Sequence, residues 1–270
     1  MKIGIVAANM PHHAEHAQAM AEGLARHNID TQIYAEHEIV PEETVVCWGW
    51  RIGRPLRELG KNVLLMERGF INRMQWCSLG WNGLNGRAGR PWAHDGEERL
   101  LAHFPMSLRR WNPHGRGALV IGQVAGDEAV RGVDMPGWYR MAVAKCYEIG
   151  FKTVRFRPHP IATQYGQKDA VEGAIIDYTP LSCSLAESEL IVTFSSNTGV
   201  DALLCGKPTI ACDAGSMAWN VAMHNFDNIS MKEPPNRAAW AASLAWSQFS
   251  LNELRSGFAW DVVKDSPTAH

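Results

Sequence analysis

The chain has 270 residues, which allows one large domain or two of ordinary size. Its formal net charge of −2 gives no basic signature for nucleic acid or an anionic membrane, so DNA binding is disfavoured. No apolar run approaches the roughly 20 residues that span a bilayer, and the six cysteines form no close pairs, so we expect reduced thiols and a cytoplasmic location.

Residues 1–115 are predicted to form a first α/β domain, because apolar runs alternate with a segment of helical spacing. The elements are expected in the order strand, helix and three strands, at Lys2–Ala8, His13–Arg26, Asp30–Tyr34, Thr44–Trp48 and Asn62–Met66. From Glu67 to Gly117 the periodicity fades and Gly, Asn, Arg and Trp dominate. We expect an irregular, functional connection there.

Residues 116–270 are predicted to form a second α/β domain that ends in helices. Strands are expected at Ala118–Val124, Thr153–Phe156, Ala174–Ile176, Leu190–Phe194 and Thr209–Cys212. Helices are expected at Pro136–Ile149, Leu181–Ser188, Arg237–Trp246 and Leu251–Val263, with another beginning near Gly199. Both halves are thus Rossmann-like, and open α/β sheets bind ligands where the carboxyl ends of their strands meet helix N-termini.

The segment Val192–Thr209, VTFSSNTGVDALLCGKPT, combines a strand, a polar turn and a helix start. Its hydroxyl and amide side chains can cap the helix. Together with unpaired backbone N–H groups they can also hold an anion such as a nucleotide phosphate. Both interpretations fit these residues when they are taken alone.

Four segments in this order resemble the bacterial capsule-polysaccharide Kdo transferases, which are related to several bacterial sialyltransferases. The segments are CWG at 47–49 with LLMERGFI at 64–71, ALVIGQVAGDEAV at 118–130, RPHP at 157–160, and the Ser-rich turn to Gly-Lys-Pro at 193–208. The resemblance implies a GT-B-type α/β fold, in which two Rossmann-like domains enclose a cleft. It also implies transfer of a sugar from a CMP- or UDP-linked donor to a hydroxyl acceptor.

The resemblance implies that residues 1–115 bind the acceptor and residues 116–270 bind the donor. Relatives have their likely catalytic base at the second acidic position of an acidic-acidic-Gly motif, where this chain has Arg68. Because a guanidinium cannot accept a proton at neutral pH, we expect Glu67 to act as the base, with Asp95 and Asp127 as weaker substitutes. The alternative for Glu67 is an ion pair with a nearby arginine.

The resemblance also implies donor contacts in the second domain. His159, held between two prolines, is expected to contact the donor phosphate or assist its departure. Gln123 is expected near the donor and Asp201 at the ribose hydroxyls, while the phosphate is held by Ser195, Ser196, Asn197, Thr198 and Gly199. Arg73 and Arg87 are expected to face the acceptor or a donor carboxylate, or else to be solvated.

We expect no tightly bound cofactor and no metal. His12, His13 and His16 are close in sequence, but they lack an evident further ligand, and no metal-binding DxD motif appears. A metal-independent mechanism is therefore favoured.

Two other functions are compatible with the sequence. With Arg68 in place of the acid, the chain could be a catalytically degenerate protein that binds sugar nucleotides without turnover. As a transferase, it could act on a modified base in DNA in place of a saccharide, with the Trp- and Arg-rich stretch Trp48–Arg116 stacking bases.

Overall fold

The computed structural model describes residues 2–91, 96–161 and 170–266, and the chain divides into two compact units. Unit 1 comprises Met1–Phe104 and Ala242–His270, and unit 2 comprises Pro105–Ala241. Each unit contains its own β-sheet with helices on both faces, so the predicted α/β class is confirmed. None of the helices in the described ranges is long and apolar enough to cross a membrane.

The sheet of unit 1 has six strands in the order β11-β5-β4-β3-β1-β2. Four of them are parallel, namely β1 (Lys2–Ala7), β2 (Asp30–Ala35), β3 (Thr44–Trp48) and β4 (Asn62–Arg68). The edge is extended antiparallel by β5 (Cys77–Trp81) and β11 (Gln248–Phe249). The β1 strand pairs with both β2 and β3, so the strand order reverses there.

Helices cover both faces of this sheet. One core lies beneath α1 (Pro11–Ala25), α9 (Leu251–Arg255) and α10 (Phe258–Val263), and the opposite core lies beneath α2 (Trp50–Glu58). The helix predicted at 251–263 is interrupted at Gly257, whose φ of 83° is in the left-handed region that favours glycine.

The C-terminal segment belongs to unit 1, whereas the sequence had placed it in the second domain. The reason is pairing and packing: β11 adds to β5, and Leu254 and Trp260 join the core beneath α1. The indole N–H of Trp81 also donates to the carbonyl of Val263 at 2.7 Å. The boundary expected at 115/116 accordingly falls after Phe104, and the chain returns to unit 1 at Ala242.

Part of the connection from Glu67 to Gly117, which was predicted to be irregular, forms regular secondary structure. It contains β5, the 3-10 turn η1 (Asn85–Arg87) and α3 (Glu98–His103). The β5 strand has no alternating pattern because all five of its residues are buried. Gly80 within it is needed for close approach, since a Cβ there would lie 2.7 Å from the Cβ of Ala88.

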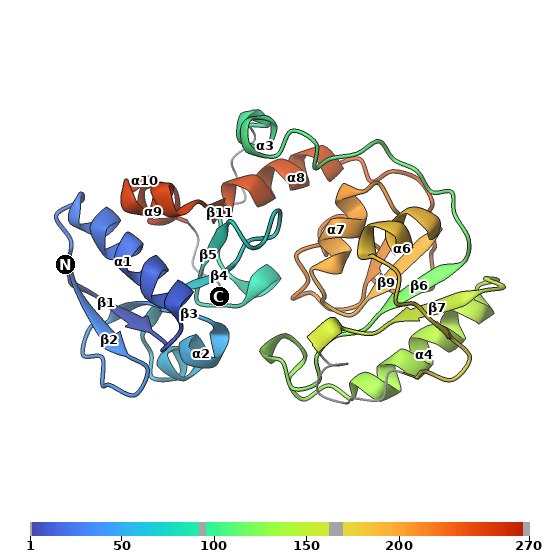
Figure 1. Cartoon of the computed structure of the whole chain (residues 1–270), viewed down its shortest axis with the longest axis horizontal. Coiled ribbons are helices and arrows are strands. Elements are labelled where there is room, and N and C mark those ends of the chain that lie inside the picture. The colour runs from blue at the N-terminus through green and yellow to red at the C-terminus, as the bar shows by residue number, and fades with distance from the viewer. Residues whose placement is uncertain (1, 92–95, 162–169, 267–270) are drawn as a thin grey trace. The chain divides into compact units, whose positions relative to one another are not determined.

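The sheet of unit 2 is entirely parallel, in the order β10-β9-β6-β7-β8. Its strands are β6 (Ala118–Ile121), β7 (Val154–Arg157), β8 (Ile175–Ile176), β9 (Leu190–Thr193) and β10 (Thr209–Ala211). One face is covered by α4 (Met135–Glu148), and the other by α6 (Leu181–Glu187) and α7 (Thr198–Leu204), as Figure 1 shows. The 3-10 turn η2 (Glu128–Val130) precedes α4, and α8 (Arg237–Trp246) leads back to unit 1.

Candidate functional site

Three predicted site residues follow neighbouring strands of unit 2. The chain runs from β6 outward through β7 to β8 and then returns to the other side of β6 as β9. Gln123 follows β6, His159 follows β7 and Ser195 follows β9. Their positions therefore coincide with the carboxyl edge at the point where the strand order reverses, the usual ligand site of such a sheet.

Gln123 and Ser195 are joined directly across this edge. The backbone N–H of Ser195 donates to Oε1 of Gln123 at 2.8 Å, and Nε2 of Gln123 donates to Oγ of Ser195 at 3.2 Å. The Ser195 hydroxyl also donates to the carbonyl of Ala129 at 3.3 Å. Ser195 is 5% exposed, so its hydroxyl locks the loops after β6 and β9 together.

Tyr139, on α4, holds the backbone of Gln123 from the other side. Its hydroxyl accepts from the Gln123 N–H at 2.7 Å and donates to the Gln123 carbonyl at 3.0 Å. Burial raises the pKa of Tyr139, although its hydrogen bond to Gln123 opposes this change. The phenol therefore remains protonated at neutral pH and can make both bonds.

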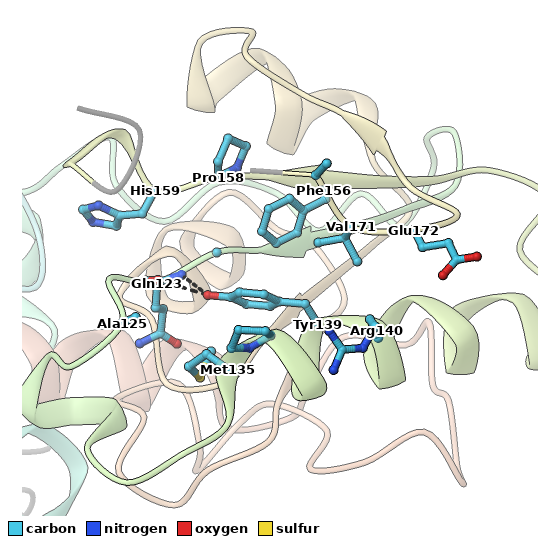
Figure 2. A pocket seen from close by; sticks show the side chains of 13 residues that line it. Gln123, Ala125, Met135, Tyr139, Arg140, Phe156, Pro158, His159, Val171 and Glu172 are labelled. Atoms are coloured by element: carbon cyan, nitrogen blue, oxygen red, sulfur yellow. Dashed lines mark hydrogen bonds between the residues drawn. The ribbon is translucent and has the colours of Figure 1, made fainter. Parts of the chain in front are cut away.

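A cavity of about 590 Å³ lies between α4 and the loop after β7. Figure 2 shows the side chains of Tyr139 and Met135 on one side and those of Phe156, Pro158 and Val171 on the other. The ends are polar: His159 and Gln123 lie at one, and Arg140 and Glu172 at the other. An apolar middle with a few polar groups, at this volume, is typical of a small-molecule site.

His159 is fixed by local backbone geometry. The N–H of Ile161 donates to its Nδ1 at 3.2 Å, so Nδ1 carries the lone pair and the proton of the neutral ring is on Nε2. Gly122 allows the strand ends to approach, because a Cβ there would lie 3.0 Å from the carbonyl oxygen of Arg157 and 3.2 Å from the nitrogen of His159. The glycine of the GQV segment thus has a packing role beside the histidine.

The remaining predicted donor contacts do not line this cavity within the described residues. Ser196, Asn197 and Thr198 are half-buried in the turn after Ser195, and the Ser196 hydroxyl accepts from the N–H of Thr198 at 3.2 Å. Gly199 is buried, and a Cβ there would lie 3.2 Å from the Cβ of Ala218. The turn is linked to the cavity lining only indirectly, because its neighbour Ser195 is hydrogen-bonded to Gln123.

Two predicted acidic residues of unit 2 have local positions. Asp201 lies one turn inside α7 and is half-buried. Asp127 caps the η2 turn, where its side chain accepts from the N–H of Ala129 at 3.4 Å. Neither lines the cavity in the part of the chain that the structure describes.

Glu67 and Arg68 leave β4 on opposite faces of the sheet of unit 1. Leu64 and Met66 pack in the core beneath α1, whereas Leu65 packs in the core beneath α2. Since side chains alternate along a strand, Arg68 lies on the α1 face and Glu67 on the α2 face. Glu67 and Arg68 therefore have different neighbours, although they are adjacent in sequence.

A buried arginine, Arg90, acts electrostatically on Glu67. The Arg90 guanidinium is 1% exposed, donates to the carbonyls of Leu79 at 2.5 Å and Asn85 at 3.1 Å, and lies 4.8 Å from the ring centre of Phe70. Burial lowers the pKa of Arg90 to about 10, and the negative charge of Glu67 opposes this change. Arg90 thus supplies positive charge for the carboxylate.

The other predicted residues of unit 1 are peripheral. Arg73 and Arg87 are exposed, and Asp95 is outside the described residues. In ranges 2–91, 96–161 and 170–266, no group of three His, Cys, Asp or Glu side chains could hold a metal ion.

Tyr139, Met135, Arg140 and Glu172 were not identified from the sequence. Tyr139 sits in a helix of ordinary amphipathic pattern, and Glu172 follows a segment without periodicity. The only sequence signal was the position of α4 directly after the loop of Gln123, which places its first turns near that edge.

No protein-family model matches this chain, and no curated protein sequence does. The solved structures that are similar to it include two transferases. Thermosulfurimonas dismutans KpsC, beta Kdo 2,4 transferase, has a TM-score of 0.57 at 15% identity, with 90% of each chain covered. Thermosulfurimonas dismutans KpsC, beta Kdo 2,7 transferase, has a TM-score of 0.57 at 14% identity, covering 97% of this chain and 100% of the other. The predicted GT-B-like fold and the structural resemblance to Kdo transferases are confirmed; at these identities the likeness shows the fold alone.

Proposed function

We propose that the protein is a glycosyltransferase that moves a sugar from a nucleotide sugar to a hydroxyl of a saccharide. The observation that carries the proposal is the cavity at the carboxyl edge of the sheet of unit 2, with His159 and Gln123 at one of its ends. The GT-B-like fold is consistent with this function but does not select it.

The shape of the cavity supports an orientation for the nucleotide. We assign the base to the apolar middle, where Tyr139 faces Phe156 and Pro158, because aromatic and proline surfaces suit a flat ring. The phosphate is assigned to the polar end with His159 and Gln123. Arg140 and Glu172 then remain at the other end to hydrogen-bond the edge of the base.

His159 has the tautomer that a departing phosphate needs. With Nδ1 accepting from Ile161, the Nε2–H group is the donor, and it stabilises the charge that develops on the phosphate oxygen. The turn Ser196–Thr198, which directly follows Ser195, is proposed as a further phosphate contact. CMP and UDP are both candidates for the nucleotide.

Glu67 is the proposed base. The acceptor oxygen forms a bond to the anomeric carbon while the bond from that carbon to the donor phosphate breaks. The hydroxyl proton passes to the Glu67 carboxylate, and the bonding electron pair leaves with the phosphate. The buried Arg90 charge supports this role because it favours the ionised carboxylate.

Arg68 favours a second candidate function, a sugar-nucleotide-binding protein without turnover, since it occupies the place of the expected acid. A hydroxylated base in DNA is a further candidate acceptor, and the net charge of −2 argues against it. Turnover separates the first alternative from a transferase. Binding of duplex DNA at low salt tests the second.

The donor site is tested by calorimetric titration of CMP and UDP into the wild type and His159→Ala. We expect the substitution to weaken nucleotide binding about 10-fold or more, because a hydrogen bond to a charged group contributes about 1.5–3 kcal/mol. His114→Ala is the matched control, since His114 is an exposed histidine of the same unit that lines a different cavity. Equal losses in both variants would contradict the assigned phosphate position.

The reaction is tested with a panel of CMP- and UDP-sugars and saccharide acceptors, by following release of the nucleotide. We expect Glu67→Gln to lower turnover while nucleotide affinity is unchanged. Nucleotide binding without turnover over the whole panel supports the binding protein, and unchanged turnover in Glu67→Gln removes Glu67 as the base.

A further inference from the structure

Three histidines and an arginine surround one indole ring in unit 1. His12, His13 and His16 lie in the first turns of α1, and their ring centres are 5.3, 5.1 and 4.7 Å from that of Trp48. The Arg68 guanidinium lies 5.7 Å from the same ring centre. Trp48 ends β3 and Arg68 ends β4, so the histidine cluster of these five residues sits at the carboxyl edge of the sheet.

The indole is covered by these side chains. Trp48 is 6% exposed, and His13 stacks on it at an interplanar angle of 26°. The cluster therefore offers no free aromatic face on which a base or sugar could stack. What it presents to a ligand is the imidazole nitrogens and the guanidinium.

Arg68 is a fixed positive charge without a counter-ion in the cluster. It is half-buried, and the described residues give it a cation–π contact with Trp48 but no ion pair with a carboxylate. A half-buried guanidinium that lacks an anionic partner is costly, and it is the side chain best suited to bind a carboxylate or phosphate in two places at once.

The surroundings of the three imidazoles favour their neutral forms. Burial lowers the pKa of His13 to about 4, with smaller effects from the positive charges of His12, Arg68 and His16. The pKa of His12 is also lowered, by burial and by Arg68. The pKa of His16 is lowered mainly by burial, whereas its hydrogen bond to the His12 backbone and the charge of exposed Glu15 oppose this change.

The three histidines differ in how a proton could be added. The Nδ1–H of His16 donates to the carbonyl of His12 at 2.6 Å, which fixes that ring. Nδ1 of His13 is buried and has no hydrogen-bond partner in the described part of the chain, so a second proton on that ring would be buried without an acceptor. His12 is half-buried and its ring makes no hydrogen bond among the described residues, so it is the histidine that can take up a proton.

We propose that the histidine cluster binds an oxyanion, a carboxylate or a phosphate group, through the Arg68 guanidinium, and that His12 takes up a proton as the anion binds. An anion beside Arg68 cancels the positive field of that guanidinium, which adds to the effect of burial in disfavouring the imidazolium. His12 and Arg68 then both donate to the same anionic group, while neutral His13 and His16 hold Trp48 and the backbone of α1. This site lies within unit 1 and does not depend on the proposed donor site.

The charged groups that surround His12 determine the sign of the pH dependence. Arg68, His13 and His16 are its basic neighbours, and the nearby carboxylate, Glu15, is exposed and lies 3.8 Å from Arg255. Bound anion raises the pKa of His12, so the complex holds a proton that the free protein lacks. Anion affinity therefore falls as pH rises through this range, by at most about tenfold per pH unit for one proton.

Isothermal titration of the full chain near pH 6 tests the proposal. The probes are glucuronate for a carboxylate, sulfate for a tetrahedral oxyanion, and glucose as the uncharged control. Bis-Tris and imidazole buffers are cationic, so they do not compete, and their different ionisation heats give the number of protons taken up. We expect one of the two anions to bind with uptake of up to one proton, and glucose to show no binding.

Variants separate the two parts of the site. Arg68→Gln should weaken anion binding about 10-fold or more, and His12→Gln should retain binding but lose proton uptake. Arg51→Gln is the matched control, because Arg51 is an exposed arginine of unit 1 that is paired with Glu36 at 2.9 Å. Near-ultraviolet circular dichroism and nucleotide affinity report whether each variant is folded.

Three results would overturn the proposal. These are the absence of binding for both anions, binding that is equal in Arg68→Gln and Arg51→Gln, and binding without proton uptake by the wild type. Nucleotide affinity is measured separately. A result that contradicts the proposed donor site therefore does not change how the anion-binding results are interpreted.

Discussion

Replacing Tyr139 by phenylalanine tests whether the edge of unit 2 is held as the structure indicates. The change removes one oxygen and leaves the ring that lines the cavity. It also leaves the N–H and carbonyl of Gln123 without their partner, because the phenol makes both bonds, at 2.7 and 3.0 Å. The loop that carries the proposed phosphate contact would then lose its attachment to α4.

The size of the effect follows from these two groups. An unsatisfied buried polar group costs about 1–3 kcal/mol, and the lower end applies because Gln123 is half-buried. Two such groups give a loss of about 2 kcal/mol, or roughly 30-fold in the equilibrium constant for opening. Nucleotide affinity should fall as well, since Gln123 would no longer be fixed against Ser195.

Hydrogen exchange of β6 amides, followed by mass spectrometry, measures this opening within unit 2 alone. Tyr147→Phe is the matched control on the same helix, since its hydroxyl donates to the carbonyl of Gly173 at 2.6 Å in an exposed position. Water replaces that bond, so about 0.5 kcal/mol is expected there. If Tyr139→Phe costs no more than Tyr147→Phe, the proposed support of Gln123 is refuted.

Two further predictions concern stability. Burial raises the pKa of Asp177, but hydrogen bonds from Thr179 and Ser184 and the charge of Arg155 outweigh this and lower it. At pH values above the ordinary aspartate pKa of about 3.9, ionised Asp177 therefore stabilises unit 2, and this stabilisation is lost as the pH falls through the lower pKa of the folded state. Urea unfolding at neutral and at acidic pH should show that acid lowers the free energy of unfolding less in Asp177→Asn than in the wild type. Arg99 is 6% exposed and donates to Glu253 at 2.5 and 3.0 Å, so Arg99→Ala should destabilise unit 1 by about 3–5 kcal/mol. Exposed Arg26→Ala is its control in thermal unfolding, and equal shifts in the two variants would contradict a structural role for this ion pair.

The sequence was sufficient to predict those helices and strands whose apolar residues, in the local pattern, are the ones that are buried in the structure. The helix expected at Pro136–Ile149 is α4 at Met135–Glu148, and the strand expected at Thr44–Trp48 has those bounds in the structure. By contrast, β11 has two residues and exists only because β5 offers an edge to pair with. No local pattern in so short a segment can predict a partner that lies 170 residues away in the chain.

The candidate site was predictable to a similar degree. Gln123 and His159 follow strands with clear apolar runs, so their place at the carboxyl edge follows from the order of the elements. The bonds from Gln123 to Ser195 and Tyr139 were not predictable, because they depend on how two loops and the helix α4 pack. The three histidines were visible as a group, but their common contact with Trp48, whose ring Arg68 also contacts, arises only when β3 and β4 lie beside α1.

Sequence alone therefore determined the α/β class, the two parallel-sheet halves and the strand ends from which site residues project, because these depend on periodicity and on local chain breaks. Tertiary structure decided the domain membership of the C-terminal helices, the opposite faces of Glu67 and Arg68, and the environment of each histidine. The physical reason is that pairing, burial and charge are properties of neighbours in space. Such neighbours are brought together only by folding.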